Sequence, residues 1–246
     1  MGKSNVDIQA SDEVSYDSLL KSPALHQNRK DYSMQQIISV IDEVIKRTGK
    51  KELHVLELGF GDGKRFKELC RIYPEAVFVG LEVREKPVGN MVALGYDCRL
   101  VETEKFDFFF DTGETFDIIY GFGVIHHMSD PYKSFESLIK LLKPGGVIQF
   151  FGEHHKYDLL SHLYTTIKGN WLYEKNVSKV KRRGFKKLLE QYTAVYRIGY
   201  DNNGFTVCFK RFNKIYCRLK LHRVPLWNCM TIFARIDKKD NNGSDN

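Results

Sequence analysis

The sequence predicts an α/β fold whose central sheet is mostly parallel. Short apolar runs alternate along the chain with segments in which apolar residues recur at helical spacing, and this alternation is typical of βαβ units. The first apolar run ends at Gly59, Gly61 and Gly63, directly before a helical segment. A glycine-rich turn between a strand and a helix is a common ligand-binding position in open α/β sheets.

Seven strands are expected. The first five are apolar runs bounded by glycine, proline or polar residues. In chain order these runs are Leu53–Leu58, Val77–Val83, Cys98–Val101, Phe116–Tyr120 and Val147–Phe151. Two later runs, Ala194–Tyr200 and Trp227–Ile236, are expected to pair as antiparallel strands at one side of a mixed sheet.

Helices are expected between these strands. Amphipathic spacing predicts them at Ser33–Arg47, Gly63–Tyr73, Lys86–Leu94, Pro131–Leu142 and Val180–Tyr192. Gly49, Pro74 and Gly95 are natural stops, and Pro131 suits a first helical turn. The sequence Lys143-Pro144-Gly145-Gly146 is expected to form a turn.

Length and composition fit one globular domain. The chain has 246 residues, 42% of them hydrophobic, and a net charge of +7. Its five cysteines show no CxxC pair, which favours reduced thiols in the cytoplasm over a zinc site or a disulfide framework. The first residues lack the apolar core of a signal peptide, and no apolar run approaches the ~18–20 residues that span a bilayer.

The domain organisation follows from these patterns. Residues 1–30 are expected to be a flexible arm, residues 31–237 one domain, and residues 238–246 a disordered tail. Within the domain, residues 156–225 are expected to form a lid or substrate region.

The glycine loop reads Glu57-Leu58-Gly59-Phe60-Gly61-Asp62-Gly63-Lys64-Arg65. A dinucleotide-binding GxGxxG would need glycine at Lys64, and a P-loop would need Ser or Thr at Arg65. Both alternatives fail on spacing. The second strand ends at Glu82, about twenty residues further on, where nucleotide-binding βαβ units place an acidic residue on the ribose.

Two further segments complete an ordered set of motifs. They are Phe116-Asp117-Ile118-Ile119-Tyr120-Gly121-Phe122-Gly123-Val124-Ile125-His126-His127-Met128-Ser129-Asp130-Pro131 and Leu141-Leu142-Lys143-Pro144-Gly145-Gly146-Val147-Ile148. Together with the glycine loop and Glu82, they resemble the class I S-adenosylmethionine (SAM)-dependent methyltransferase family, in its small-molecule branch. The resemblance covers roughly Val55–Phe151. It implies a Rossmann-like fold with a mostly parallel seven-stranded sheet, helices on both faces, and SAM as cofactor.

The resemblance also implies a set of cofactor-binding residues. Those for the methionine end are Glu57, Gly59, Phe60 and Gly61, with Tyr120, Gly121 and Phe122 lining the cofactor nearby. Those for the ribose are Glu82 and Val83, and those beside adenine are Thr103 and Glu104, where the match to the family is weakest.

Histidines are the candidates for a general base, because imidazole titrates near neutral pH. His127 is the first choice by similarity, with His126 as the second catalytic candidate. His154, His155 and Trp171 are candidates for contact with the substrate. The alternative for each is a packing role. Adjacent histidines point apart, so no metal site is expected.

The acceptor is expected to be a small molecule, a saccharide or a lipid-linked intermediate, methylated at a hydroxyl oxygen. Basic residues concentrate late in the chain, and an anionic acceptor, nucleic acid or a membrane surface would suit them. An RNA methyltransferase, a non-catalytic SAM-binding protein and a polyamine synthase are the alternatives. The intact glycine loop and Glu82 argue against a non-catalytic protein, and the lack of acidic residues after the fourth strand argues against a polyamine synthase.

Overall fold

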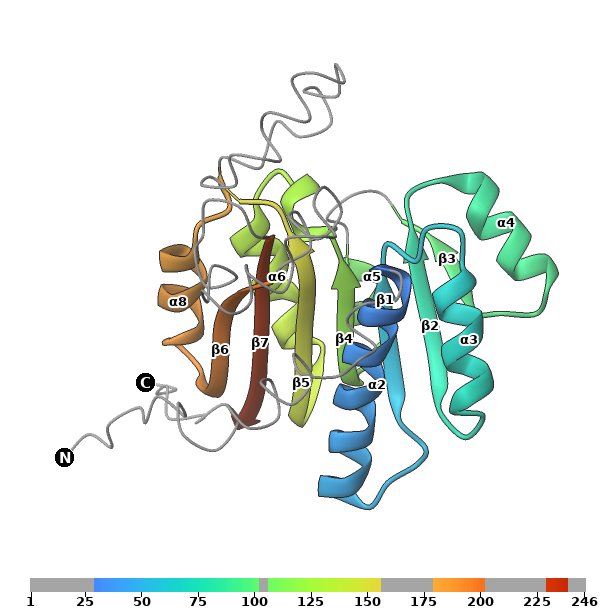
Figure 1. Cartoon of the computed structure of the whole chain (residues 1–246), viewed down its shortest axis with the longest axis horizontal. Helices are drawn as coiled ribbons and strands as arrows, with labels where there is room; N and C mark the ends of the chain where they lie inside the picture. The colour runs from blue at the N-terminus through green and yellow to red at the C-terminus, as the bar shows by residue number, and fades with distance from the viewer. Residues whose placement is uncertain (1–28, 102–105, 156–178, 202–228, 239–246) are drawn as a thin grey trace, which may run out of the picture.

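A computed structural model describes residues 29–101, 106–155, 179–201 and 229–238 (Figure 1). Most of the expected arm, tail and lid lies outside these ranges, as do Thr103, Glu104 and Trp171. The described parts differ from the expectation, because Arg29 and Lys30 are helical, Lys238 ends a strand, and residues 179–201 of the expected lid include a helix and a strand of the sheet. Among the described residues, no helix is long and apolar enough to cross a membrane.

Seven strands form one sheet in the order β3-β2-β1-β4-β5-β7-β6 (Figure 1). Their bounds are β1 His54–Leu58, β2 Val77–Glu82, β3 Cys98–Leu100, β4 Phe116–Phe122, β5 Leu142–Glu153, β6 Thr193–Asp201 and β7 Cys229–Lys238. Strands β1 to β5 pair in parallel, and β7 is antiparallel to both β5 and β6. The expected mixed sheet with a final antiparallel pair is confirmed.

Helices cover both faces of the sheet, as expected. They are α2 Arg29–Thr48, α3 Lys64–Ile72, α4 Glu85–Ala93, α5 Asp107–Thr112, α6 Pro131–Lys140 and α8 Arg182–Leu189, with a 3₁₀ turn η2 at Ile125–His127. The side chains of α2, α3 and α4 pack on one face, and those of α5, α6 and α8 pack on the other. Helix α6 begins at Pro131, as the sequence predicts. The carboxylate of Asp130, the residue before it, accepts the main-chain N–H groups of Tyr132 and Lys133.

The two cores follow from the alternation of side chains along each strand. In β1, Val55 packs with α2 and α3 while Leu56 packs on the opposite face. Phe66 of α3 and Phe135 of α6 are fully buried, one in each core. The carboxyl ends of β1, β2, β4 and β5 therefore meet at one edge of a sheet that is buried on both faces.

The topology places a switch point between β1 and β4. The chain runs outward from β1 to β2 and β3, then returns to the other side of β1 with β4. Loops that leave the carboxyl ends of β1 and β4 therefore diverge, and ligands of open α/β sheets bind at this position.

The segment Lys143–Gly146 corrects the expectation of a turn. It lies inside β5, where Phe116 pairs with Leu142 and Ile118 with Val147. Asp117 alone therefore opposes the whole segment, which forms a bulge with Gly145 at φ 78°. A bulge of this kind needs the same turn-forming residues as a turn, so the sequence alone does not distinguish a bulge from a turn.

Helix α5 and the turn η2 are absent from the expectations. Helix α5 is short, and its Phe109 packs edge-on against Phe116 with ring centroids 5.2 Å apart. Six residues rich in phenylalanine give no helical periodicity, so tertiary packing rather than local preference defines this helix.

Asp117 ties three strands together at the amino edge of the sheet. Its Oδ2 accepts the main-chain N–H of His54, at 2.9 Å, and the Lys143 ammonium, at 2.7 Å. We expect Asp117→Ala to lower the free energy of unfolding by about 1–3 kcal/mol, because both donors lose a charged partner. Urea denaturation measures this change. Glu75→Ala removes an exposed ion pair with Lys51 and should change stability by less than about 0.5 kcal/mol. Equal losses in the two variants would contradict the role of Asp117.

Candidate active site at the carboxyl edge

The glycine loop leaves β1 and turns sharply into α3. Gly59, Gly61 and Gly63 have φ values of 65°, 66° and 73°, in the left-handed region that favours glycine. The loop is fixed to β2 by a hydrogen bond from the Gly59 N–H to the Leu81 carbonyl, at 2.8 Å. The loop is thus held to the sheet where a ligand would approach.

Space around the three glycines differs. A Cβ on Gly59 would lie 3.1 Å from Val124, and a Cβ on Gly63 would lie 2.4 Å from the Met91 sulfur. A Cβ on Gly61 would come no nearer than 3.9 Å to Arg84. Packing therefore requires glycine at the ends of the loop, whereas the main chain of Gly61 is approachable.

Phe60 lies between these glycines but faces inward. Its ring is buried 5.9 Å from the ring of Phe66, and a Cβ on Gly80 would meet it. Of the expected cofactor-binding residues in the loop, Phe60 can therefore offer its main chain rather than its side chain.

Glu82 ends β2 beside the loop. Its Oε2 accepts the Gly61 N–H at 3.0 Å, and its Oε1 accepts the N–H of Val83, the next residue, at 3.1 Å. The Arg84 guanidinium also donates to both oxygens, each at 3.0 Å. Burial raises the pKa of Glu82, but these donors outweigh burial and the net pKa is lowered. Glu82 is thus an ionised acceptor at the loop.

Arg84 occupies the acceptor positions that ribose hydroxyls would use. Its side chain is 60% exposed, so it can leave the carboxylate at small cost. Glu82 can therefore accept the two hydroxyls of a ribose once the guanidinium of Arg84 has moved away from its carboxylate.

Glu57, at the end of β1, is completely buried. Its Oε2 accepts the Tyr120 hydroxyl at 2.7 Å, and its Oε1 accepts Nη2 of Arg65 at 3.0 Å. Burial raises the pKa of Glu57, and the charge and hydrogen bonds of Arg65 and Tyr120 oppose that rise. Burial and the Glu57 charge also raise the pKa of Tyr120 well above its usual value, so its hydroxyl stays a donor.

Arg65 extends this network to the end of β4. Its guanidinium lies 3.7 Å from the centre of the Phe122 ring, and Phe122 stacks on Phe151 with centroids 4.6 Å apart. Gly121 beside them leaves no room for a Cβ, which would lie 2.6 Å from Val124. Tyr120, Gly121, Phe122 and Arg65 thus form one packed group at the end of β4, within which Tyr120 is completely buried.

Glu153 ends β5 and is completely buried. Its Oε1 accepts the Val124 N–H at 3.0 Å. Its Oε2 accepts the His126 N–H at 3.2 Å and contacts His126 Nδ1 at 2.7 Å. The carboxylate therefore fixes the loop after β4.

The histidines gather around this pair. The His126 ring is buried, and its centroid lies 4.1 Å from that of exposed His127 and 5.0 Å from that of His154. His154 Nδ1 lies 3.7 Å from the Cys229 sulfur. Buried His155 packs 5.1 Å from Tyr200. The structure thus brings His126, His127 and His154 together, while His155 packs against β6.

No group of three or more potential metal ligands occurs in the described ranges. Burial raises the pKa of Cys70 to about 11 and that of Cys98 to about 12. Both side chains are therefore protonated thiols at neutral pH, which are poor ligands and poor nucleophiles.

Arg65, Arg84 and Glu153 belong to the site but were absent from the predicted residues. Glu153 had one signal, its place before His154-His155 at a strand end. Arg84 has one too, since it follows Glu82 by only two residues, whereas Arg65 lies eight residues from Glu57, across the glycine loop.

Comparison with known proteins agrees with this geometry. A family model described as a methyltransferase domain matches residues 56–148. The ubiquinone biosynthesis O-methyltransferase of Cereibacter sphaeroides is 30% identical over 136 residues, which are 52% of this chain and 54% of that protein. The protein of the same name from Coxiella burnetii is 24% identical over 144 residues, 55% and 56% of the two chains. The chain spans about half the length of the curated relatives it matches.

Solved structures share the fold. The plantazolicin methyltransferase BamL, in complex with a triazolic desmethylPZN analog and SAH, has a TM-score of 0.60 at 15% identity, over 92% of this chain and 90% of that one. A putative sarcosine dimethylglycine methyltransferase from Galdieria sulphuraria has a TM-score of 0.58 at 14% identity, over 92% and 98%.

The fold is therefore the Rossmann-like fold of class I methyltransferases. Residues 56–148 match the methyltransferase-domain model, and the curated relatives that the chain matches over about half their length are named as methyltransferases.

Gly63 and Gly49 form a matched pair for the loop geometry. Their φ values are similar, 73° and 69°, but a Cβ added at Gly49 would meet no atom within 4 Å, while one at Gly63 would meet Met91. We expect Gly49→Ala to cost about 1–2 kcal/mol from backbone strain alone. Gly63→Ala should cost more, by about 1–3 kcal/mol for the overpacking. Urea denaturation of both variants measures the difference, and equal costs would contradict the close packing of the loop on α4.

Tyr120→Phe tests the buried Glu57 network. It removes the hydroxyl that donates to Glu57 Oε2, so stability should fall by about 1–3 kcal/mol. The hydroxyl opposes the raised pKa of Glu57, so its loss raises that pKa further. A carboxyl group with a raised folded pKa contributes less stability as pH rises through that pKa, so the loss should be larger at about pH 7 than at about pH 4.

Tyr73→Phe is the control for this variant, because the Tyr73 hydroxyl donates to exposed Asp42 at 2.8 Å. Its effect should stay below about 1 kcal/mol. Thermal or urea denaturation at the two pH values measures both. A pH-independent loss in Tyr120→Phe would count against a buried carboxylate at Glu57.

Proposed function

We propose that this protein is a SAM-dependent methyltransferase that transfers a methyl group to a hydroxyl oxygen of a small-molecule, saccharide or lipid-linked acceptor. The observation that carries the proposal is the bond between the Gly61 N–H and Glu82. It places an ionised carboxylate of β2 against the glycine loop of β1, where a nucleoside ribose binds in this class of fold.

The proposed cofactor contacts follow from the site. Glu82 accepts the ribose hydroxyls after Arg84 moves aside, with the main chain of Val83 beside it. The main chain of Gly59, Phe60 and Gly61 faces the methionine end. Glu57 acts there through Arg65 and Tyr120, since its own oxygens are occupied.

The rest of the cofactor pocket is assigned as follows. Gly121 and Phe122 close the crevice at the end of β4, where Phe122 is held between Arg65 and Phe151. Thr103 and Glu104, beside adenine, rest on the family resemblance alone.

Bound SAM would supply a sulfonium-activated methyl group. Its methyl group would pass from sulfur to the acceptor oxygen, leaving S-adenosylhomocysteine, and a base of the protein would take the hydroxyl proton. The protein has to align the acceptor oxygen with the methyl group and exclude water, which can lower the barrier by roughly 7–11 kcal/mol in well-oriented reactions. The base is drawn from the pair His126 and His127 at the crevice.

Two observations favour an oxygen of a small acceptor over nucleic acid. The curated relatives are named O-methyltransferases of ubiquinone biosynthesis. Part of the late basic group is also used within the protein, since Lys179 donates to the Ser129 carbonyl at 2.6 Å and Lys186 lies 3.8 Å from Glu190. His154 and Trp171 remain the proposed contacts to the acceptor, whereas His155 is withdrawn, because it is buried against Tyr200.

Calorimetry with SAM and S-adenosylhomocysteine tests the proposal, with NAD and ATP as controls. Selective binding of the two sulfur compounds is expected. A screen of hydroxyl-bearing sugars, phenols and lipids with methyl-labelled SAM then tests the transfer, with RNA as the competing acceptor. Binding without any transfer would favour a non-catalytic SAM-binding protein, and transfer to RNA alone would overturn the small-molecule acceptor.

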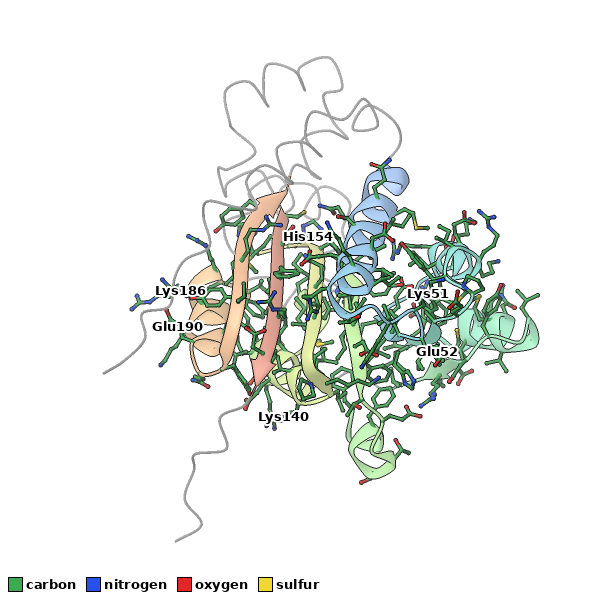
Figure 2. The ribbon with its side chains drawn as sticks, turned by 90° about the horizontal axis from the view of Figure 1, so that it is seen from below. Lys51, Glu52, Lys140, His154, Lys186 and Glu190 are labelled. Carbon is green, nitrogen blue, oxygen red and sulfur yellow. The ribbon has the colours of Figure 1, made fainter. Side chains whose placement is uncertain are left out.

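Glu82→Gln should weaken SAM binding by about 10- to 100-fold, since hydrogen bonds to a charged acceptor contribute about 1.5–3 kcal/mol. The control is Glu52→Gln. Glu52 lies just before β1, at the opposite edge of the sheet from Glu82, and is labelled with Lys51 in Figure 2. Unchanged SAM affinity in Glu82→Gln, measured by calorimetry, would show that the ribose binds elsewhere.

A further inference from the structure

The Glu153 carboxylate is surrounded by donors from one loop. The Val124 N–H, the His126 N–H and the His126 ring converge on it at 3.0, 3.2 and 2.7 Å. All three donors come from the segment that links β4 to α6, and Glu153 comes from the end of β5. A buried carboxylate needs such partners, and in return it fixes the position of everything that donates to it.

The contact also determines which nitrogen of His126 carries the proton. An ionised carboxylate only accepts hydrogen bonds, so Nδ1 must donate to it. In the neutral imidazole, the lone pair then belongs to Nε2. A carboxylate that fixes a histidine in this way is the arrangement by which many general bases are oriented.

The position of the ring suits a base for methyl transfer. His126 lies between the carboxyl ends of β4 and β5, on the edge that carries the glycine loop and Glu82. The rings of His127 and His154 flank it at 4.1 and 5.0 Å. Burial of the Glu153–His126 pair removes water, which strengthens each hydrogen bond within it.

His127 differs from its neighbour in its surroundings. It is exposed, whereas the His126 ring is only 2% exposed and lies against a buried carboxylate. The described contacts therefore distinguish His126, whose ring lies against a buried carboxylate, from the exposed His127.

We infer that Glu153 is a positioning residue that holds His126 in the Nδ1–H tautomer, so that Nε2 takes the proton from the acceptor hydroxyl during methyl transfer. This assignment rests on the proposed function for its chemical step. The tautomer itself does not, and it can be measured in the protein alone.

The first experiment is ¹H–¹⁵N NMR of the histidine rings in the full chain, with His126 assigned by loss of its signals in His126→Asn. The native protein should show Nδ1–H at His126. In Glu153→Gln the amide N–H₂ can donate to Nδ1, so the proton should move to Nε2. An Nε2–H tautomer in the native protein, or no change in Glu153→Gln, would overturn the assignment.

The second experiment measures turnover with the hydroxyl acceptor found in the screen. Glu153→Gln should lower kcat about 100-fold or more, the scale of general-base catalysis, while the Kd for SAM stays within about twofold. Glu190→Gln is the control, since this exposed carboxylate makes the same chemical change just after α8. Figure 2 shows Glu190 beside Lys186, away from His154.

Glu153→Asp separates positioning from folding, because it keeps the carboxylate and withdraws it by one methylene. It should keep Nδ1–H and recover part of kcat. A folded Glu153→Asp that is as slow as Glu153→Gln would overturn the positioning role, as would a loss of kcat in His127→Ala but not in His126→Asn. If no hydroxyl acceptor is methylated by the native protein, the proposed function fails, while the NMR result still decides what Glu153 does.

Discussion

The buried carboxylate of Glu57 constrains the carboxyl edge of the sheet more than any other group. A charge without exposed surface must be paired, and here its partners come from α3 and from β4. Pairing sets where Arg65 lies, and Arg65 in turn lies over the ring of Phe122. The first turn of α3 and the end of β4 are thereby held against each other.

Glu82 and Glu153 repeat the same device at other strand ends. Each is a nearly or fully buried glutamate that accepts main-chain N–H groups from an adjoining loop, Gly61 in one case and Val124 in the other. These carboxylates thus accept the hydrogen bonds of loop N–H groups that have no partner within a helix or strand. The loops are held by the sheet itself, so the site is built on its most rigid part.

Local signals decided how much could be predicted from the sequence. The run Leu53–Leu58 is bounded on both sides, so the sequence places the strand to within a residue, and Pro131 marks the first turn of α6. The segment Lys143–Gly146 was misassigned because a bulge and a turn need the same residues. The pairings of Glu57 with Tyr120 and of His126 with Glu153 join residues 63 and 27 positions apart. No local pattern encodes such distances, so the candidate residues were found but not their partners.

The strand order also determines when the sheet can be completed during synthesis. Strand β6 has no neighbour other than β7 in the described sheet, and β7 lies between it and β5. As the chain leaves the ribosome, the residues of β6 emerge before those of β7, the strand through which β6 joins the sheet. Helix α8 can cover β6 through Phe185 and Ile198, which lie in one core, but the strand stays unpaired until Cys229–Lys238 has been made. The nascent chain therefore exposes an open edge at β5 for that interval, and this edge is its most exposed point for mispairing with another chain.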